Sequence, residues 1–223
     1  MSQWLFSSVG RKWVMAVTGL FLCTFLVVHL SGNLLTLIPD EGKTFNAFAH
    51  FMSHNWIIRF LEVVLFSGFL LHIIQGLVLM VRNRKSRPVR YAVHAAAPSV
   101  SWSSLNMGLL GTLLLVFLVV HVGDFFVESR FTPEKLGTDA QGYVNLYAEV
   151  VHSFSSLPYT LFYVLAMVAL GFHLWHGFQS AFRSLGLMHS RYTPAVIWTG
   201  KVYTVVITAG FLFIPLYWYF MQL

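Results

Sequence analysis

Residues 13–38, with the sequence WVMAVTGLFLCTFLVVHLSGNLLTLI, form one long apolar run whose polar side chains are few and mostly small. At 1.5 Å per residue, a helix of about 26 residues crosses roughly 30 Å of hydrocarbon. Arg11 and Lys12 precede the run, and no small-residue cleavage site follows it. Because the run is also longer than the roughly 7–15 apolar residues of a signal peptide, we predict a first transmembrane helix.

The rest of the chain has the same character. Of its 223 residues, 57% are hydrophobic and 10% are charged, whereas a soluble domain has roughly 25% charged residues. Further apolar runs predict spans at about residues 56–81, 105–127, 157–182 and 196–220. An open strand edge is not tolerated in lipid, so these spans are expected to be helices. We therefore expect an all-α protein, a single membrane domain over residues 1–223 with five transmembrane helices.

The charged residues divide between the two sides of the expected membrane. The N-terminal segment and the loops after the second and fourth spans hold ten basic residues and no acidic ones: Arg11, Lys12, Arg82, Arg84, Lys85, Arg87, Arg90, Arg183, Arg191 and Lys201. All eight acidic residues are on the other side. The positive-inside rule predicts a cytoplasmic N-terminus and an outside C-terminus. The basic face fits anionic lipid, a cytoplasmic protein partner, or both.

The connections on the acidic side are expected to contain surface helices. Residues 45–56 alternate apolar and polar side chains, with His50 and His54 four residues apart, which fits a helix lying in the interface. Residues 143–154 predict a second surface helix. The single cysteine, Cys23, excludes a disulfide and an iron–sulfur cluster built from this chain alone.

The first four spans each carry a histidine late in the apolar run, where such residues are costly and rare. These are His29, His72, His121 and His173. The first and third share the local sequence Val-Val-His, and the second and fourth share a glycine four residues after the histidine. Such matched surroundings in four successive spans indicate a common role.

Counting from the basic ends of the helices gives each histidine a depth. His29 and His121 are 17 residues from that end, whereas His72 and His173 are 10 residues from it. The four residues therefore form two pairs at two depths, roughly 10 Å apart. Bis-histidine ligation of a haem iron requires two imidazoles that face each other across a helix bundle. For any one of them, a hydrogen bond to a neighbouring helix is the ordinary alternative.

Other residues of these helices have two interpretations. Five glycines either give room to a porphyrin edge or serve ordinary helix packing: Gly19, Gly68, Gly76, Gly171 and Gly177. His176 lies three residues from His173, and we expect it to make a supporting contact rather than to ligate.

Taken together, these features resemble the di-haem cytochrome b membrane anchor of succinate dehydrogenase or fumarate reductase. The resemblance covers nearly the whole chain. It consists of the opening Ser-Ser-Val-Gly-Arg-Lys at residues 7–12, the five spans, and the paired histidine in each of the first four spans. It implies that His29 and His121 bind a distal haem b and that His72 and His173 bind a proximal haem b. The family has an acidic residue in some members where this chain has Gly171.

The resemblance also implies a division of labour among subunits. A flavoprotein subunit carries out the dicarboxylate chemistry, for which this chain has no active site, and an iron–sulfur subunit passes electrons to the membrane subunit. The implied substrate in the membrane is a quinone, usually menaquinone. Lipid, quinone and the two soluble subunits are thus the expected partners, and nucleic acid is not.

Some residues are candidates by their location alone. Haem propionates need cationic or hydrogen-bonding partners, and near the proximal level the chain offers Arg11, Trp102 and Arg183. Near the distal level it offers Arg59 or Arg130. A quinone site needs a hydrogen-bond donor or proton carrier beside an apolar slot, for which the candidates are Asn33, Glu62 and Asp124. The two carboxylates are equally well explained as interfacial side chains.

Rival functions predict other patterns. A bc-type cytochrome b has two histidines about 13–14 residues apart in one helix, and the nitrate reductase membrane subunit uses its fifth span; this chain has neither arrangement. A proton transporter predicts polar groups along a path between the histidines. A haem-free anchor leaves the matched histidines without a role. Another di-haem, quinone-reactive membrane cytochrome b is the nearest alternative.

Overall fold

A computed structural model describes residues 7–85 and 101–223 of the chain. Within these two ranges the protein is helical, and the one extended feature is an isolated bridge between Thr138 and Val144. Five helices are long and apolar enough to cross a membrane, so the chain is a multi-pass membrane protein of the expected all-α class. Arg87 and Arg90 of the expected basic face lie outside the described residues.

The five expected spans are confirmed. They are α2 (Ser8–Leu34), α4 (Trp56–Lys85), α6 (Met107–His121), α9 (Leu157–Ser184) and α10 (Thr193–Phe220). The helix α4 was expected to end near residue 81, yet it continues to Lys85. Arginine and lysine are good helix formers whose charged ends reach water. Hydropathy therefore marks the apolar part of a helix and not its end.

The third span is less regular than the single helix expected over residues 105–127. The short helix α5 (Trp102–Leu105) precedes α6, which is followed by the π-helical segment η2 (Val122–Val127) and by α7 (Glu128–Phe131). The π-helix is rare and occurs often at functional sites. This one begins directly after His121.

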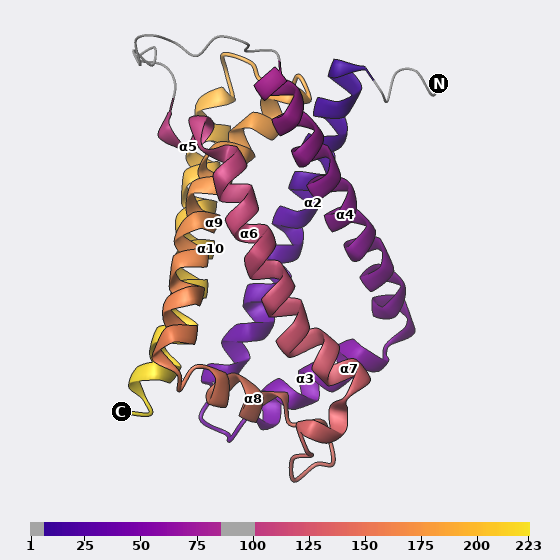
Figure 1. Ribbon diagram of the computed structural model, residues 1–223, viewed down its shortest axis with the longest axis vertical. Helices are drawn as coiled ribbons and strands as arrows, with labels where there is room; N and C mark the ends of the chain where they lie inside the picture. The colour runs from indigo at the N-terminus through magenta and orange to yellow at the C-terminus, as the bar shows by residue number, and fades with distance from the viewer. Residues whose placement is uncertain (1–6, 86–100) are drawn as a thin grey trace.

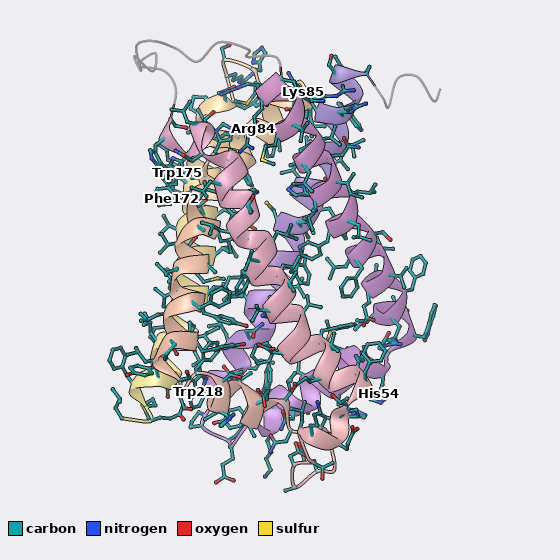
Figure 2. The ribbon with its side chains drawn as sticks, in the orientation of Figure 1. His54, Arg84, Lys85, Phe172, Trp175 and Trp218 are labelled. Atoms are coloured by element: carbon teal, nitrogen blue, oxygen red, sulfur yellow. The ribbon has the colours of Figure 1, made fainter. Side chains whose placement is uncertain are left out.

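Helix α9 packs against α10, α2 and α6, and lies beside α10 along one side of the bundle (Figure 1). Its close approach to α10 requires a glycine at position 171, where a Cβ would lie 3.0 Å from Oγ1 of Thr208. The buried core between α2, α9 and α10 consists of Leu30, Leu174, Ile207 and Ile214. Many apolar side chains on the remaining helix faces are exposed (Figure 2), as expected of helices that face lipid.

The start of α2 and the end of α10 lie at opposite ends of the bundle (Figure 1). Arg84 and Lys85 lie at the N-terminal end, and His54 and Trp218 lie at the C-terminal end (Figure 2). The basic segments and the acidic connections thus occupy opposite ends, as the charge pattern predicts.

The C-terminal end is closed by α3 (Lys43–His54), η1 (Leu35–Leu37), α8 (Leu146–Ser153) and the loop 137–145, which we call the end cap. Asn46 of α3 is 1% exposed and joins α3 to the loop and to α8. Its amide donates to Asp139 and to Asn145, both at 3.1 Å, and its oxygen accepts from the backbone N–H of Tyr147 at 3.0 Å. Both expected surface helices are therefore confirmed, and α8 begins at Leu146 because Asn145 caps it.

The carboxylate of Asp139 accepts three hydrogen bonds within the end cap. It accepts from the backbone N–H groups of Gln141 and Tyr143, each at 2.9 Å, as well as from Asn46. Partial burial alone would raise the pKa of Asp139, but these hydrogen bonds together outweigh it and lower the pKa. The loop is thus organised around an ionised carboxylate.

Candidate functional site

The four intramembrane histidines come together in the two pairs that the depth argument predicts. His29 of α2 faces His121 of α6, with ring centroids 5.6 Å apart. His72 of α4 faces His173 of α9, with ring centroids 6.3 Å apart. By distance from the N-terminal end, we call these the distal pair and the proximal pair. Each pair joins alternate membrane helices.

The two levels are further apart than the expected 10 Å. On α2, Gly19 lies against His72 of the proximal pair, and His29 follows ten residues later, or about 15 Å along the axis. On α6, Gly111 lies near His173, and His121 again follows ten residues later. Two helices therefore give the same spacing. Counting from Arg82 underestimates the spacing because Arg82 and Lys12 are not at the same level: His72 lies against Gly19, which is only about 10 Å from Lys12 along α2.

A threonine on α2 orients one imidazole of the proximal pair. Oγ1 of Thr18 lies 3.1 Å from Nδ1 of His72, and the same hydroxyl donates to the carbonyl of Val14 at 2.8 Å. A hydroxyl has a single proton, so Thr18 accepts and His72 donates from Nδ1. This leaves the lone pair on Nε2, the nitrogen that remains for a metal.

The partner imidazole has no such contact. Nδ1 of His173 is buried without a hydrogen-bond partner among the described residues. A buried nitrogen left unpaired is unfavourable and is among the features that indicate a missing ion or ligand.

The ring separation of the proximal pair fits a metal between its two imidazoles, whereas the distal rings are closer together. An imidazole nitrogen lies about 2.0–2.1 Å from a bound metal, and about 1.2 Å from the centre of its own ring, so two axial imidazoles have centroids about 6.4 Å apart. The observed separations are 6.3 Å in the proximal pair and 5.6 Å in the distal pair. The described residues form no cluster of three or more histidine, cysteine or acidic ligands. Pairs of imidazoles alone suit a haem, whose porphyrin supplies four more nitrogens.

One of the five glycines gives room to a paired histidine, while their role beside a porphyrin edge stays a prediction. A Cβ at Gly19 would lie 3.3 Å from Cε1 of His72, so a side chain there would press on the imidazole. Gly68 and Gly171 instead allow helix packing, against Phe21 and Thr208. Gly76 has Met15 nearby, and Gly177 has open space around it.

The candidates at the N-terminal end lie in different surroundings. A pocket of about 100 Å³ is lined by Arg183 and His176 together with Ser101, Trp175, Gln179 and Ser180. Trp102 packs edge-on against Phe172 and is largely exposed. Arg11 lies in the first turn of α2. Of the three expected propionate partners, Arg183 is thus the one that lines a polar pocket, and His176 joins it there.

The candidate quinone and propionate residues at the C-terminal end also differ in their contacts. The amide nitrogen of Asn33 is 3.4 Å from Nδ1 of His29 while it donates to the carbonyl of the same residue. Glu62 is instead held by Arg130 at 2.8 Å and by Arg59 at 3.6 Å. Both arginines expected near the distal level therefore pair with Glu62. Arg130 also donates to the carbonyl of Ser53.

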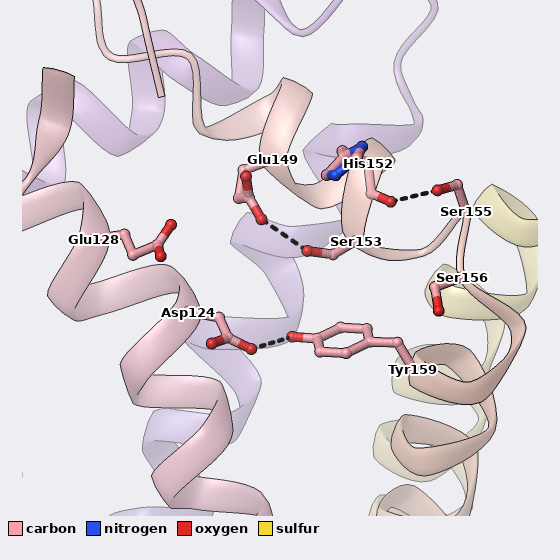
Figure 3. Close-up of a pocket in the computed structure, with 8 residues that line it drawn as sticks. All are labelled: Asp124, Glu128, Glu149, His152, Ser153, Ser155, Ser156 and Tyr159. Carbon is pink, nitrogen blue, oxygen red and sulfur yellow. Dashed lines mark hydrogen bonds between the residues drawn. The ribbon is translucent and has the colours of Figure 1, made fainter. Parts of the chain in front are cut away.

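Asp124 lies at the wall of a pocket of about 350 Å³ at this end. The pocket is lined by Asp124, Glu128, Glu149, His152, Ser153, Ser155, Ser156 and Tyr159 (Figure 3). Tyr159 donates to Asp124 at 2.8 Å. Three carboxylates make this pocket polar and acidic, unlike the apolar slot expected for a quinone.

Sequence reasoning missed several groups that contact the histidines. Each distal histidine stacks on the phenylalanine four residues before it, His29 on Phe25 and His121 on Phe117. The signal was present, since Phe-Leu-Val-Val-His occurs at both places. Thr18 has no comparable signal, because its partner His72 is 54 residues away.

No family model matches the chain, and no similar curated protein or solved structure was found. The function is therefore argued from the residues of the chain and their geometry.

Proposed function

We propose that this chain is a di-haem cytochrome b, the membrane-anchor subunit of a succinate:quinone oxidoreductase. The observation that carries the proposal is the presence of two histidine pairs at two levels, each bridging alternate helices with ring centroids 5.6 and 6.3 Å apart. A single histidine in a membrane helix has many explanations. Four that meet in two pairs at metal-binding separation support haem ligation.

The residues that hold the two haems b are the two pairs. His29 and His121 ligate the distal haem, and His72 and His173 ligate the proximal haem. Thr18 holds His72 so that Nε2 points its lone pair away from α2. Haem supplies one-electron redox chemistry, and two such groups at successive levels give the chain a path for electrons across the bundle.

The N-terminal end is the side on which the soluble partners dock. Its basic residues and the positive-inside rule support a cytoplasmic location in a prokaryotic inner membrane. The iron–sulfur subunit sits on this face and connects the flavoprotein subunit to the proximal haem. In the pocket lined by Arg183, His176 and Gln179, an anionic propionate meets one cation and two polar side chains. Arg11 and Trp102 are weaker candidates for the same role.

Quinone, in the form of menaquinone, reacts near the distal level. Asn33 lies beside the distal pair. Asp124 is connected to the pair through two tyrosines but lines a polar, acidic pocket, so it is the weaker candidate. Glu62 is a poorer candidate than the sequence suggests, because Arg130 already neutralises it. The chain itself carries out no dicarboxylate chemistry.

An absorption spectrum of the purified, dithionite-reduced protein tests the proposal. We expect a b-type spectrum with two haems per chain by pyridine haemochrome assay. Replacing His29 or His121 by alanine removes the distal haem, and replacing His72 or His173 removes the proximal haem, each leaving the other in place. The matched control is His152→Ala in α8, a histidine outside both pairs, which keeps both haems. A colourless reduced protein contradicts the proposal.

Co-purification separates this function from the nearest alternative. A succinate:quinone oxidoreductase anchor, isolated from its own membrane in mild detergent, retains a flavoprotein and an iron–sulfur protein. Another di-haem cytochrome b has the same spectrum without these two partners. A proton transporter has neither.

A further inference from the structure

A continuous chain of hydrogen bonds leads from the distal histidine pair to the acidic pocket. Nδ1 of His121 lies 3.3 Å from the hydroxyl of Tyr163, which lies 3.0 Å from the hydroxyl of Tyr159. Tyr159 lies 2.8 Å from Oδ2 of Asp124 (Figure 3). Four side chains from two elements, α9 and the α6–η2 segment, are thus connected in one line.

The carboxylate at the end of the line fixes the direction of every bond. An ionised carboxylate only accepts, and each phenol has one proton. Tyr159 donates to Asp124, so its oxygen accepts from Tyr163. The oxygen of Tyr163 must then accept from Nδ1–H of His121. The proton of the imidazole is on Nδ1, and the lone pair is on Nε2.

Helix geometry keeps the members of the line in register. Tyr159 and Tyr163 are four residues apart on α9, so they lie on one helix face, and their rings are 4.7 Å apart. Phe117, Phe125 and Phe154 pack around Tyr163. Asp124 is in η2, three residues after His121. The acid and the histidine are therefore presented to the same pair of tyrosines.

We propose that Asp124, Tyr159 and Tyr163 are positioning residues that hold His121 as the Nδ1–H tautomer and convey the negative charge of Asp124 to its imidazole. The relay makes Nε2 of His121 more electron-donating. Its effect on a haem iron rests on the proposed function. A hydrogen bond from a ligating histidine to an anionic acceptor raises the basicity of the ligand. Such a ligand favours the oxidised metal.

Among the four paired histidines, His121 alone has this arrangement in the described structure. His72 donates to Thr18, whose own proton goes to a backbone carbonyl and not to an acid. His173 has no partner at Nδ1. Asn33 approaches both ring nitrogens of His29 at 3.4 and 3.5 Å, and so it selects neither tautomer. The relay is a specific property of one ligand of the distal pair.

The first test needs no haem. In the full-length chain, produced without haem and labelled with ¹⁵N-histidine, we expect the nitrogen spectrum to show His121 protonated at Nδ1 alone; the signal is assigned by its loss in His121→Gln. In Tyr163→Phe the preference disappears, because a phenyl ring accepts no such bond. An Nε2–H tautomer in the unchanged chain, or the same tautomer preference in Tyr163→Phe, overturns the proposal.

The second test measures the midpoint potentials of the haem-loaded protein. We expect Asp124→Asn, Tyr159→Phe and Tyr163→Phe each to shift the distal haem to a higher potential and to leave the proximal haem unchanged. The amide oxygen introduced by Asp124→Asn still accepts from Tyr159, so this variant separates the charge of the relay from its geometry. Potentials unchanged in all three variants overturn the proposal.

Two matched controls accompany these variants. Glu128→Gln removes a carboxylate from the same pocket that has no hydrogen bond to Tyr159. Tyr203→Phe removes another half-buried hydroxyl, one that donates to the carbonyl of Cys23. Both are expected to leave the two potentials unchanged, and a shift as large as that of Tyr163→Phe counts against a specific relay. If the chain binds no haem, the proposed function is wrong, while the nitrogen spectrum still decides on the relay.

Discussion

Thr18 and His72 lie on neighbouring membrane helices, and the threonine hydroxyl accepts from Nδ1 of the histidine at 3.1 Å. The hydroxyl is itself held by the carbonyl of Val14, one turn earlier in α2. Gly19, the next residue along α2, brings its backbone up to the imidazole. Two adjacent residues of the first span therefore set both the orientation and the clearance of a histidine in the second.

Thr18→Val tests the orienting role of the hydroxyl. Valine keeps the shape of the side chain and removes the acceptor, so Nδ1–H of His72 is left unpaired. Loss of a supporting hydrogen bond to a metal ligand costs about 10–100-fold in affinity. We expect a loss of this size at the proximal haem, measured by haem titration, with the distal haem unaffected. Thr18→Ser retains the hydroxyl and should retain affinity; equal affinities in the valine and serine variants would count against the role.

Gly19→Ala tests the clearance. Its Cβ would stand 3.3 Å from Cε1 of His72, and overpacking of this kind costs about 1–3 kcal/mol. We expect proximal haem affinity to fall by about tenfold. The control is Gly177→Ala, where nothing lies within 4 Å of the added atom. If both alanine variants bind haem alike, the contact at Gly19 has no role in the site.

A double-mutant cycle tests whether Glu62 is structural. Its carboxylate is 2.8 Å from Arg130, and the two side chains are 22% and 19% exposed. We expect Glu62→Gln and Arg130→Gln each to destabilise the contact between α4 and α7, with a coupling energy of about 1 kcal/mol, measured by unfolding in SDS. A quinone ligand predicts a different result, in which Glu62→Gln raises the KM for quinone and Arg130→Gln does not.

The end cap should open in acid. The pKa of Asp139 is lowered in the folded protein from its ordinary value of 3.8. A lowered carboxylate pKa stabilises the fold above the unfolded value, and that contribution is lost as the pH falls through the folded pKa. We therefore expect the backbone N–H groups of Gln141 and Tyr143 to lose protection below about pH 4, with no change near neutrality, measured by hydrogen exchange relative to the unfolded chain at each pH. Asp139→Asn should show the same protection at all these pH values, and a pH-independent wild-type loop would contradict the prediction.

Much of this architecture follows from sequence because lipid allows few alternatives. The five spans and the two surface helices were predictable from apolar runs and amphipathic alternation. Equal counts from the basic ends were enough to pair His29 with His121 and His72 with His173, since alternate spans run in the same direction and equal counts along them reach one level.

The remainder depends on contacts between distant residues. The π-helical segment after His121 has no signature in the sequence, because it arises from packing. The line from Asp124 through Tyr159 and Tyr163 requires knowing which faces of α6 and α9 meet. Glu62 and Arg130 are 68 residues apart in the chain, and no local sequence pattern predicts their pairing. The sequence indicates at which level of its helix a residue lies, but not which neighbouring helix its side chain faces.

The buried Asn46 has a consequence for biosynthesis. Its partners Asp139, Asn145 and Tyr147 are 93 to 101 positions further along the chain. A ribosome that has completed the first two spans has yet to make any of them. The nascent protein is therefore open at this end until the third span has been inserted and the segment beyond it has been delivered, and its last step of closure comes late in translation.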